Sequence, residues 1–174
     1  MIDTDVTGRK YITCDLDLTL CDTAIRDAEL EPFNPDNPAT ADPAFWENYH
    51  CRCGSDAPIA RNVRLLVDLA RHYDVVLVSN RSSSARGATI DWLVANVPIP
   101  GLAGWPLQDT DPATSHLILH TPTTGRMADP VQEKVHKIVQ VVAARAADHA
   151  FHIDDQDPVI QRLAARGLTG VRVA

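Results

Sequence analysis

The chain has 174 residues, of which 45% are hydrophobic and 22% are charged, so it is long enough to bury the core of one globular domain. Its net charge of −7 argues against a long groove for duplex nucleic acid, whose binding depends on neutralising phosphates, but it permits a short grip on a strand end. The N-terminal residues contain no apolar signal-peptide core, and no apolar run approaches the length that crosses a bilayer. We therefore expect a soluble, cytoplasmic protein that does not contact membranes.

Two carboxylates end the first predicted strand, in the sequence KYITCDLDLT at residues 10–19. Because side chains alternate along a strand, Asp15 and Asp17 are expected to point the same way and to repel each other unless a cation lies between them. Mg²⁺ prefers oxygen ligands and binds one or two protein carboxylates together with waters and phosphate oxygens. The pair therefore suggests phosphoryl transfer, in which one carboxylate attacks phosphorus and the other moves protons. Thr19 is placed to hold the loop by hydrogen bonding.

The segment 22–56 follows this strand and is expected to form a small cap over the strand ends. Residues 27–41 within it are rich in Pro, Asn and Asp, which is the composition of a loop. A short helix is predicted to follow, with Asp42 as its N-cap and Pro43 at its first position. Aromatic residues at helical spacing along this helix are expected to pack on the core.

The four cysteines are expected to be reduced and free, because they lack the paired CxxC spacing of a zinc site. His50 clusters with Cys51 and Cys53, but no fourth ligand accompanies them, so zinc binding is the lesser interpretation. Cys14 falls inside the first predicted strand and Cys21 lies just after the Asp-x-Asp motif.

Three later strands are also predicted to end in polar residues, which matters because aspartate and threonine alone are ordinary turn residues. A helix over residues 58–72 precedes the β-branched run 75–78, which is typical of a strand buried on both faces, and Ser79, Asn80 and Arg81 follow. A hydroxyl and a guanidinium there suit phosphate recognition, although a serine can equally cap the helix predicted over 82–97.

The remaining strands are predicted at residues 116–120, 150–153 and 170–173. The helix after the first of these carries Lys134 in its first turn, where a cation is disfavoured unless it is exposed or faces an anion. The second strand ends in the acidic residues Asp154, Asp155 and Asp157. Carboxylates are favourable at the start of a helix, but these also supply the further ligands that a metal site would need.

Strands and helices that alternate in this way predict a three-layer, doubly wound α/β fold, in which ligands bind outside the carboxyl ends of the strands. The segments that carry these strand ends resemble the four signatures of the haloacid dehalogenase (HAD) superfamily of aspartate-nucleophile phosphatases. CDLDLTL, VLVSNR, a lysine and HIDDQDP occur in that superfamily's order and span nearly the whole chain.

The resemblance implies a Rossmann-like parallel sheet of strand order 5-4-1-2-3, with a small cap insert after strand 1. It implies that Asp15 is the nucleophile and Asp17 the general acid and base. Mg²⁺ would be held by Asp15, the Asp17 carbonyl and Asp154 or Asp155. The catalytic residues that bind the transferred phosphoryl group would be Ser79 and Lys134.

Within the superfamily the chain is most similar to the 3′-phosphatase domain of phage-type polynucleotide kinase-phosphatases, in which arginines occur at the places of Arg26 and Arg81. Asn80 stands where that group has glycine, and Asp129 lies one position further from its lysine. The sequence contains no GxxxxGK[ST] motif for a kinase half. We expect substrate contacts from five residues: Thr19, Arg26, Asn80, Arg81 and Asp129.

Two arginines near an acidic mouth favour a ligand that carries more than one phosphate. We therefore expect the partner to be a 3′-phosphorylated nucleic-acid end, which the protein would heal for ligation. A 5′(3′)-nucleotidase would use the same catalytic residues, with the segment 22–56 recognising the nucleoside of a mononucleotide. The third alternative is a non-catalytic phosphate-binding module, although a scaffold has no chemical need for the full set of residues.

Overall fold

The computed structural model describes residues 9–30, 42–120, 129–145 and 147–173. Its main sheet has five parallel strands in the spatial order β5-β4-β1-β6-β7, with β1 in the centre. When these five strands are counted along the chain, the order reads 5-4-1-2-3 from the β7 edge, so the predicted order is confirmed. The strands are β1 (Tyr11–Cys14), β4 (Asp74–Ser82), β5 (Leu117–His120), β6 (His149–Asp154) and β7 (Gly170–Arg172).

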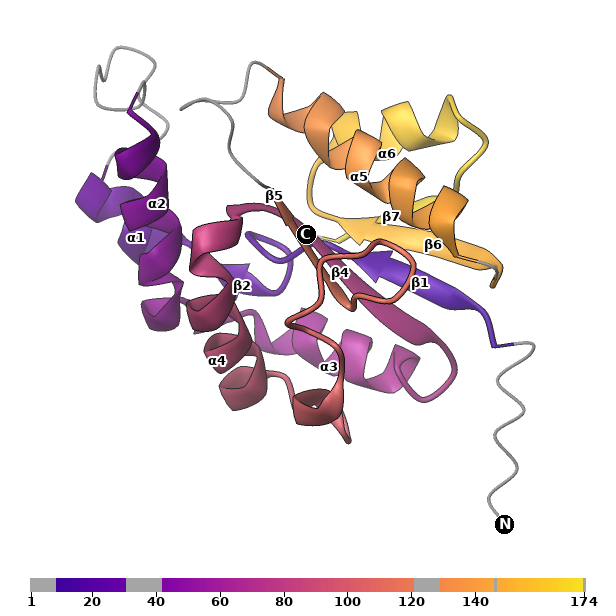
Figure 1. Ribbon diagram of the computed structural model, residues 1–174, viewed down its shortest axis with the longest axis horizontal. Coiled ribbons are helices and arrows are strands. Elements are labelled where there is room, and N and C mark those ends of the chain that lie inside the picture. The colour runs from indigo at the N-terminus through magenta and orange to yellow at the C-terminus, as the bar shows by residue number, and fades with distance from the viewer. Residues whose placement is uncertain (1–8, 31–41, 121–128, 146, 174) are drawn as a thin grey trace.

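Helices cover both faces of the sheet, which confirms the predicted three layers (Figure 1). Along β4, Val75 and Leu77 face the layer of α3 and α4, whereas Val76 and Val78 face the layer of α5 and α6. Both faces of this strand are therefore buried from solvent, which explains why its residues form a continuous apolar run instead of alternating with polar ones. The helices are α1 (Ala24–Leu30), α2 (Pro43–Cys51), α3 (Ala60–Leu69), α4 (Arg86–Asn96), α5 (Pro130–Ala144) and α6 (Asp157–Ala164).

Both ends of the segment 22–56 lie at one place, because β2 (Cys21–Asp22) pairs antiparallel with β3 (Ala57–Pro58). Between these strands lie α1, α2 and a short 3-10 helix (Arg52–Ser55). They stand beside α4, at the end of the sheet toward which β1 runs (Figure 1). The predicted start of α2 is confirmed, since the Asp42 carboxylate accepts the Ala44 N–H at 2.9 Å.

Helix α1 departs from the sequence-based expectation. We expected loop over residues 27–41, but residues 27–30 belong to this helix. Asp22 favours its start by accepting the Ala24 N–H at 2.9 Å, and Arg26 anchors it through buried ion pairs. These contacts outweigh the loop-like composition that follows, and the rest of that range lies outside the described residues.

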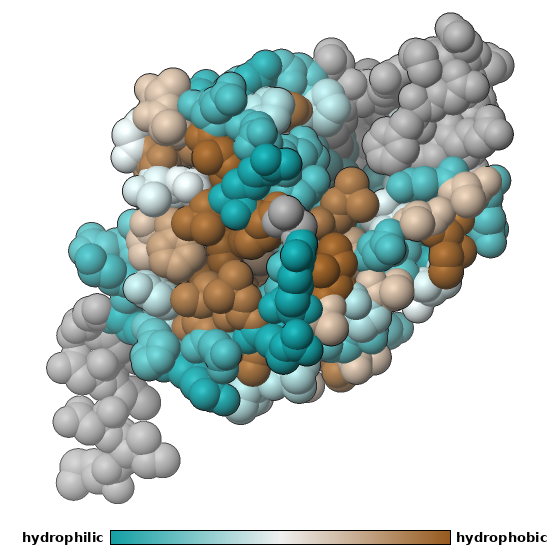
Figure 2. Space-filling view, turned by 180° about the vertical axis from the view of Figure 1, so that it is seen from behind, coloured by the Kyte–Doolittle hydropathy of each residue, from teal (hydrophilic) through white to brown (hydrophobic). Residues whose placement is uncertain are grey.

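Most large hydrophobic side chains are buried in the two layers. Seen from behind, hydrophobic residues still gather across the middle of one face, with hydrophilic residues around them (Figure 2). Within the described part of the chain, no helix is both long enough and apolar enough to span a bilayer. Among the described residues, the large hydrophobic side chains that remain exposed are Leu18, Ile25, Leu65, Val94 and Val171.

The neighbouring leucines of α3 test this layering. Leu66 is 1% exposed and packs in the core, whereas Leu65 is 41% exposed. We expect Leu66→Ala to lower the free energy of unfolding by about 2–5 kcal/mol, because it leaves a cavity. The control Leu65→Ala should cost about 1 kcal/mol or less. Urea unfolding measures both, and equal losses would contradict the assigned orientation of α3.

Candidate active site

Three carboxylates meet at the carboxyl ends of the two central strands. Asp15 directly follows β1, Asp154 ends β6 and Asp155 comes next. One oxygen from each lies within 4.8 Å of the other two. Asp15 and Asp154 are buried, and Asp155 is half-buried. This group, called the carboxylate cluster below, combines the sequence motifs that lie farthest apart in the chain.

Lys134 is the cation of the carboxylate cluster. It projects from the first turns of α5, and its Nζ lies 3.0 Å from Asp15 Oδ1 and 3.3 Å from Asp154 Oδ2. Its burial acts to lower the lysine pKa, but the two carboxylates more than offset this and hold the pKa above its usual value. Burial raises the pKa of Asp15 to about 7, and the negative charge of Asp154 adds to the rise while Lys134 opposes it. One ammonium is therefore too little charge for this cluster.

Thr19 links the two ends of the chain inside the site. Its hydroxyl oxygen lies 3.2 Å from carboxylate oxygens of both Asp15 and Asp155, and it accepts the Asp155 N–H at 3.1 Å. Its carbonyl accepts the side-chain amide of Asn62 at 2.8 Å. The threonine thus fixes the spacing between the first and the last acidic motif.

Asp17 does not join its neighbour. We expected it to point the same way as Asp15, but β1 ends at Cys14, so period-two alternation no longer applies. The turn that follows includes Leu18 at φ 61, a left-handed conformation that is rare for a non-glycine residue and is typical of functional loops. The Asp17 carboxylate therefore enters a second group of charges.

This second group, the arginine cluster, contains Asp17, Asp56, Arg26 and Arg81. Arg81 forms two bonds to Asp17, from Nη2 at 2.7 Å and from Nε at 3.0 Å, and Arg26 also pairs with Asp17. Arg26 binds Asp56 through Nε at 2.8 Å and Nη2 at 2.7 Å. Two guanidinium groups and two carboxylates leave the arginine cluster without net charge.

The arginine cluster fixes the charge state of Asp17. Burial alone would raise its pKa, but Arg81 and Arg26 hold the pKa far below the usual range of a carboxyl group. Both arginines are fully buried, so in this arrangement they contact Asp17 rather than solvent. Among the described residues, Arg26 Nη1 has no hydrogen-bond partner, and its guanidinium carbon lies 4.5 Å from the centre of the Tyr49 ring.

The polar end of β4 is tied to α5. Ser79 is buried, and its hydroxyl accepts the Arg81 N–H at 3.1 Å. The Nζ of Lys137, one turn after Lys134, donates to the Ser79 carbonyl at 2.6 Å and to Asn80 Oδ1 at 2.7 Å. Asn80 also donates to the Pro130 carbonyl at 2.8 Å, so both polar atoms of its side chain are engaged by α5.

Two acidic candidates lie outside these clusters. Asp129 is the N-cap of α5, accepting the Gln132 N–H at 2.9 Å, and it pairs with Arg162 at 2.8 Å. Asp157 begins α6 and pairs with Arg172 at 3.2 Å. Their contacts are those of helix capping and surface ion pairing.

The residues considered for zinc do not form a ligand group among the described residues. His50 Nδ1 accepts the Ser82 N–H at 3.0 Å, and Cys53 Sγ lies 3.8 Å from the Thr89 hydroxyl. Cys51 is exposed, and all four cysteines are free thiols, as expected. Cys21 is instead part of the arginine-cluster surroundings, 3.0 Å from Arg81 Nη2.

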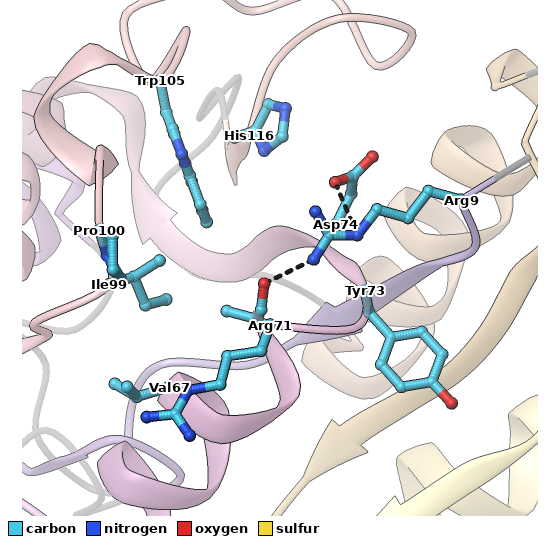
Figure 3. A pocket seen from close by; sticks show the side chains of 10 residues that line it. Arg9, Val67, Arg71, Tyr73, Asp74, Ile99, Pro100, Trp105 and His116 are labelled. Atoms are coloured by element: carbon cyan, nitrogen blue, oxygen red, sulfur yellow. Dashed lines mark hydrogen bonds and ion pairs between the residues drawn. The ribbon is translucent and has the colours of Figure 1, made fainter. Parts of the chain in front are cut away.

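A cavity of about 330 Å³ lies at the other end of the sheet, where β4 and β5 begin (Figure 3). Trp105 and His116 stand across it from Arg71 and Val67. Its charged groups have partners already: Arg9 pairs with Asp74 at 3.7 Å and donates to the Ala70 carbonyl at 2.7 Å. The cavity is therefore separate from the carboxylate cluster and brings no reactive group to it.

A scan against models of protein families finds no match to this chain, and a search of curated proteins finds none either. Solved structures do match. A chain in the structure of a Pnkp1/Rnl/Hen1 complex superposes with a TM-score of 0.58 at 19% sequence identity, over 97% of this chain and 47% of that one. The present chain thus spans about half the length of that neighbour, and a second structure of the complex is described as an RNA repair complex.

Two further neighbours are nearly equal in extent to this chain. A haloacid dehalogenase-like hydrolase from Streptococcus pneumoniae matches with a TM-score of 0.55 at 16% identity, over 97% of this chain and 86% of that one. A HAD-family enzyme from Bacteroides thetaiotaomicron, in complex with magnesium and inorganic phosphate, matches with a TM-score of 0.51 at 16% identity, over 96% and 95%. The chain has the HAD fold.

Three buried residues of these networks were not foreseen. Asp56 had no local sequence signal, since it is a lone acid in a loop that returns to the core 30 residues after Arg26. Lys137 had a weak one, because it lies three residues after Lys134 and so shares its helix face. His152 contacts Asp154 at 3.0 Å. It lies two residues before Asp154, so on a strand the two side chains point to the same face of the sheet.

The buried ammonium of Lys137 makes stability depend on pH. Burial lowers the pKa of Lys137 from 10.5 to about 7. Between these values the unfolded chain binds more protons than the folded one, so this contribution to stability rises with pH. Relative to Lys137→Met, the free energy of unfolding of the wild type should rise by up to about 1.4 kcal/mol per pH unit from pH 7 toward pH 10. Urea unfolding at pH 7 and pH 9 measures this, with the exposed Lys10→Met as control. A difference that is independent of pH would contradict the lowered pKa of Lys137.

Proposed function

We propose that the chain is a Mg²⁺-dependent phosphomonoesterase that forms an aspartyl-phosphate on Asp15 and removes 3′-phosphates from nucleic-acid ends. The observation that supports the chemistry is the setting of Asp15 at the end of the central strand. It is buried, it faces the Lys134 ammonium at 3.0 Å, and two further carboxylates stand beside it. An attacking oxygen and a cation that can hold a phosphoryl oxygen therefore lie together.

The carboxylate cluster fits a divalent hard cation. All its ligand atoms are oxygens, which Mg²⁺ prefers, and they already lie within 4.8 Å of one another. With all three groups ionised, Lys134 leaves two negative charges uncompensated. We propose that Asp15 and Asp154 or Asp155, with the Asp17 carbonyl, hold Mg²⁺, which when bound polarises the phosphoryl oxygens.

Different residues then serve the two halves of the reaction. Asp15 attacks phosphorus, while Lys134 and Ser79 bind the oxygens of the transferred group. Asp17 exchanges protons with the leaving group and with the water that hydrolyses the aspartyl-phosphate. The arginine cluster keeps Asp17 ionised in this arrangement, so Asp17 gains a proton to donate to the leaving group only where its contacts with Arg26 and Arg81 loosen. Through Asp17, Arg26 and Arg81 would contribute to catalysis with any substrate.

The substrate class rests on likeness rather than on geometry. The fold extends over 97% of this chain in the Pnkp1/Rnl/Hen1 neighbour, and a structure of that complex is described as an RNA repair complex. The sequence adds Arg26 and Arg81 at the places where 3′-phosphatases of kinase-phosphatases have arginines. Together they favour a 3′-phosphorylated end, bound by a protein whose charge of −7 allows only a short contact with the strand.

We also propose that the segment 22–56 is a cap that contacts the substrate. Helices α1 and α2 stand at the carboxyl end of the sheet (Figure 1). The segment is fixed to the site at two points, by the ion pair of the buried Arg26 with Asp17 and by the Ser82 N–H that His50 accepts at 3.0 Å. These contacts hold the segment beside the candidate site, which supports its proposed role in contacting the substrate.

Removal of the nucleophile tests the chemistry. Asp15→Asn should lower Mg²⁺-dependent phosphate release by about 10³-fold or more, because an amide cannot attack phosphorus. Asp157→Asn is the matched control, since this acid is exposed and paired only with Arg172 in the described structure, and it should retain wild-type activity. Substantial phosphate release by Asp15→Asn would show that the reaction does not pass through an aspartyl-phosphate.

A panel of substrates tests the specificity. Phosphate release should be measured with Mg²⁺ on 3′-phosphorylated and 5′-phosphorylated oligonucleotides and on 3′- and 5′-mononucleotides. We expect the highest kcat/KM on the 3′-phosphorylated oligonucleotide, with a shallow dependence on salt because few phosphates are contacted. Higher kcat/KM on 5′-mononucleotides would favour the nucleotidase. No release from any member would favour a non-catalytic phosphate-binding module.

A further inference from the structure

Two histidines of β6 face the same threonine of β1, although they are three residues apart. In a regular strand His149 and His152 would point to opposite faces of the sheet. The register shifts here, because Tyr11 pairs with His149 but Thr13 pairs with His152, so β6 contains one extra residue in this stretch. Such a bulge re-aims side chains, and both imidazoles lie within 3.0 Å of the Thr13 hydroxyl.

The hydrogen bonds of these residues form one directed chain that ends on Asp154. His152 Nε2 lies 3.0 Å from Asp154 Oδ2, and because a carboxylate only accepts, Nε2 carries the proton. In the neutral ring Nδ1 is then an acceptor, so it receives the Thr13 hydroxyl at 2.9 Å. The same hydroxyl oxygen accepts from His149 Nε2 at 3.0 Å. Burial lowers the pKa of His149 to about 4.

The Asp154 carboxylate is held from three directions. Besides the bond from His152, Oδ2 lies 3.3 Å from Lys134 Nζ, and Oδ1 accepts the Gln156 N–H at 2.9 Å. Thr13, His152 and Asp154 have no exposed surface. The carboxylate is therefore held in a single orientation, with one of its oxygens within 4.8 Å of a carboxylate oxygen of both Asp15 and Asp155.

We propose that His152 is a positioning residue that fixes Asp154 for cation binding, and that Thr13 and His149 fix the orientation of the His152 ring. The inference rests on the proposed function in one respect, that Asp154 belongs to a cation site. Stability alone does not require this chain, because an apolar pair at Thr13 and His152 would fill the same core positions without burying polar groups. A second buried group that orients a ligand is a general feature of metal sites.

Thr13→Val tests the proposal with little change of shape, because it removes only the hydroxyl that holds the His152 ring through Nδ1. Mn²⁺ binding to the full chain is measured from the electron paramagnetic resonance signal of free Mn²⁺, which needs no catalysis. We expect the affinity to fall by about 10- to 100-fold in Thr13→Val. Thr13→Ser keeps the hydroxyl and should restore the affinity. The KM for p-nitrophenyl phosphate should stay unchanged while the Mg²⁺ concentration for half-maximal activity rises.

Ring ¹⁵N NMR gives a second, independent measurement. The wild type should show His152 protonated on Nε2, and in Thr13→Val the signal of Nδ1 should shift because its hydrogen bond from the hydroxyl is lost. His152→Gln, whose amide can donate to Asp154, should bind Mn²⁺ more tightly than His152→Leu, with circular dichroism confirming that both variants fold.

Two results would overturn the proposal: wild-type Mn²⁺ affinity in Thr13→Val, or an Nδ1-protonated His152 in the wild type. Failure of the proposed function gives a different pattern. If Thr13→Val weakens Mn²⁺ binding but the wild type releases phosphate from no phosphomonoester, the positioning role stands and the phosphatase does not.

Discussion

The repulsion among Asp15, Asp154 and Asp155 is the constraint on which the site depends. Because β1 and β6 are hydrogen-bonded neighbours in a parallel sheet, the carboxylates at their ends cannot separate without breaking the sheet. Lys134 supplies one compensating charge, and the pKa of Asp15 still rises to about 7. The bonds from Lys137 to Ser79 and Asn80 hold α5 against β4 and so keep Lys134 in place.

In the arginine cluster, by contrast, the carboxylate charges are fully compensated by guanidinium groups. Asp17 and Asp56 face two guanidinium groups that bind them bidentately, as planar guanidinium does with carboxylates. A cation would find these oxygens already occupied, although Asp17, Cys21 and Asp56 have ligand atoms near one another. Of the two clusters, only the one around Asp15 has charge to offer a metal ion. The end of β1 at Cys14 is what allows these aspartates, two residues apart, to enter such different surroundings.

The sequence was sufficient for the features that local patterns encode. The unbroken apolar run of β4 predicted a strand that is buried on both faces, and Asp42 predicted the start of α2. The polar residues at the strand ends predicted where side chains would converge. It was insufficient where partners meet only through the fold. The pairing of Arg26 with Asp56 spans 30 residues, and the bond of Thr13 to His152 depends on a bulge that no residue pattern announces. The divergence of Asp15 and Asp17 was missed because the end of β1, rather than the motif, decides it.

The arginine cluster also joins the segment 22–56 to the chemistry. Arg26 comes from α1 near the start of that segment and Asp56 from its end, and the two form a buried ion pair against Asp17. The positive charge that holds the pKa of Asp17 low therefore comes partly from the same segment that would contact a substrate. If the segment moved away, Asp17 would keep its own burial but lose the charge of Arg26, and its pKa would rise. The position of α1 and the pKa of Asp17 are thus coupled, because a single buried guanidinium, that of Arg26, takes part in both.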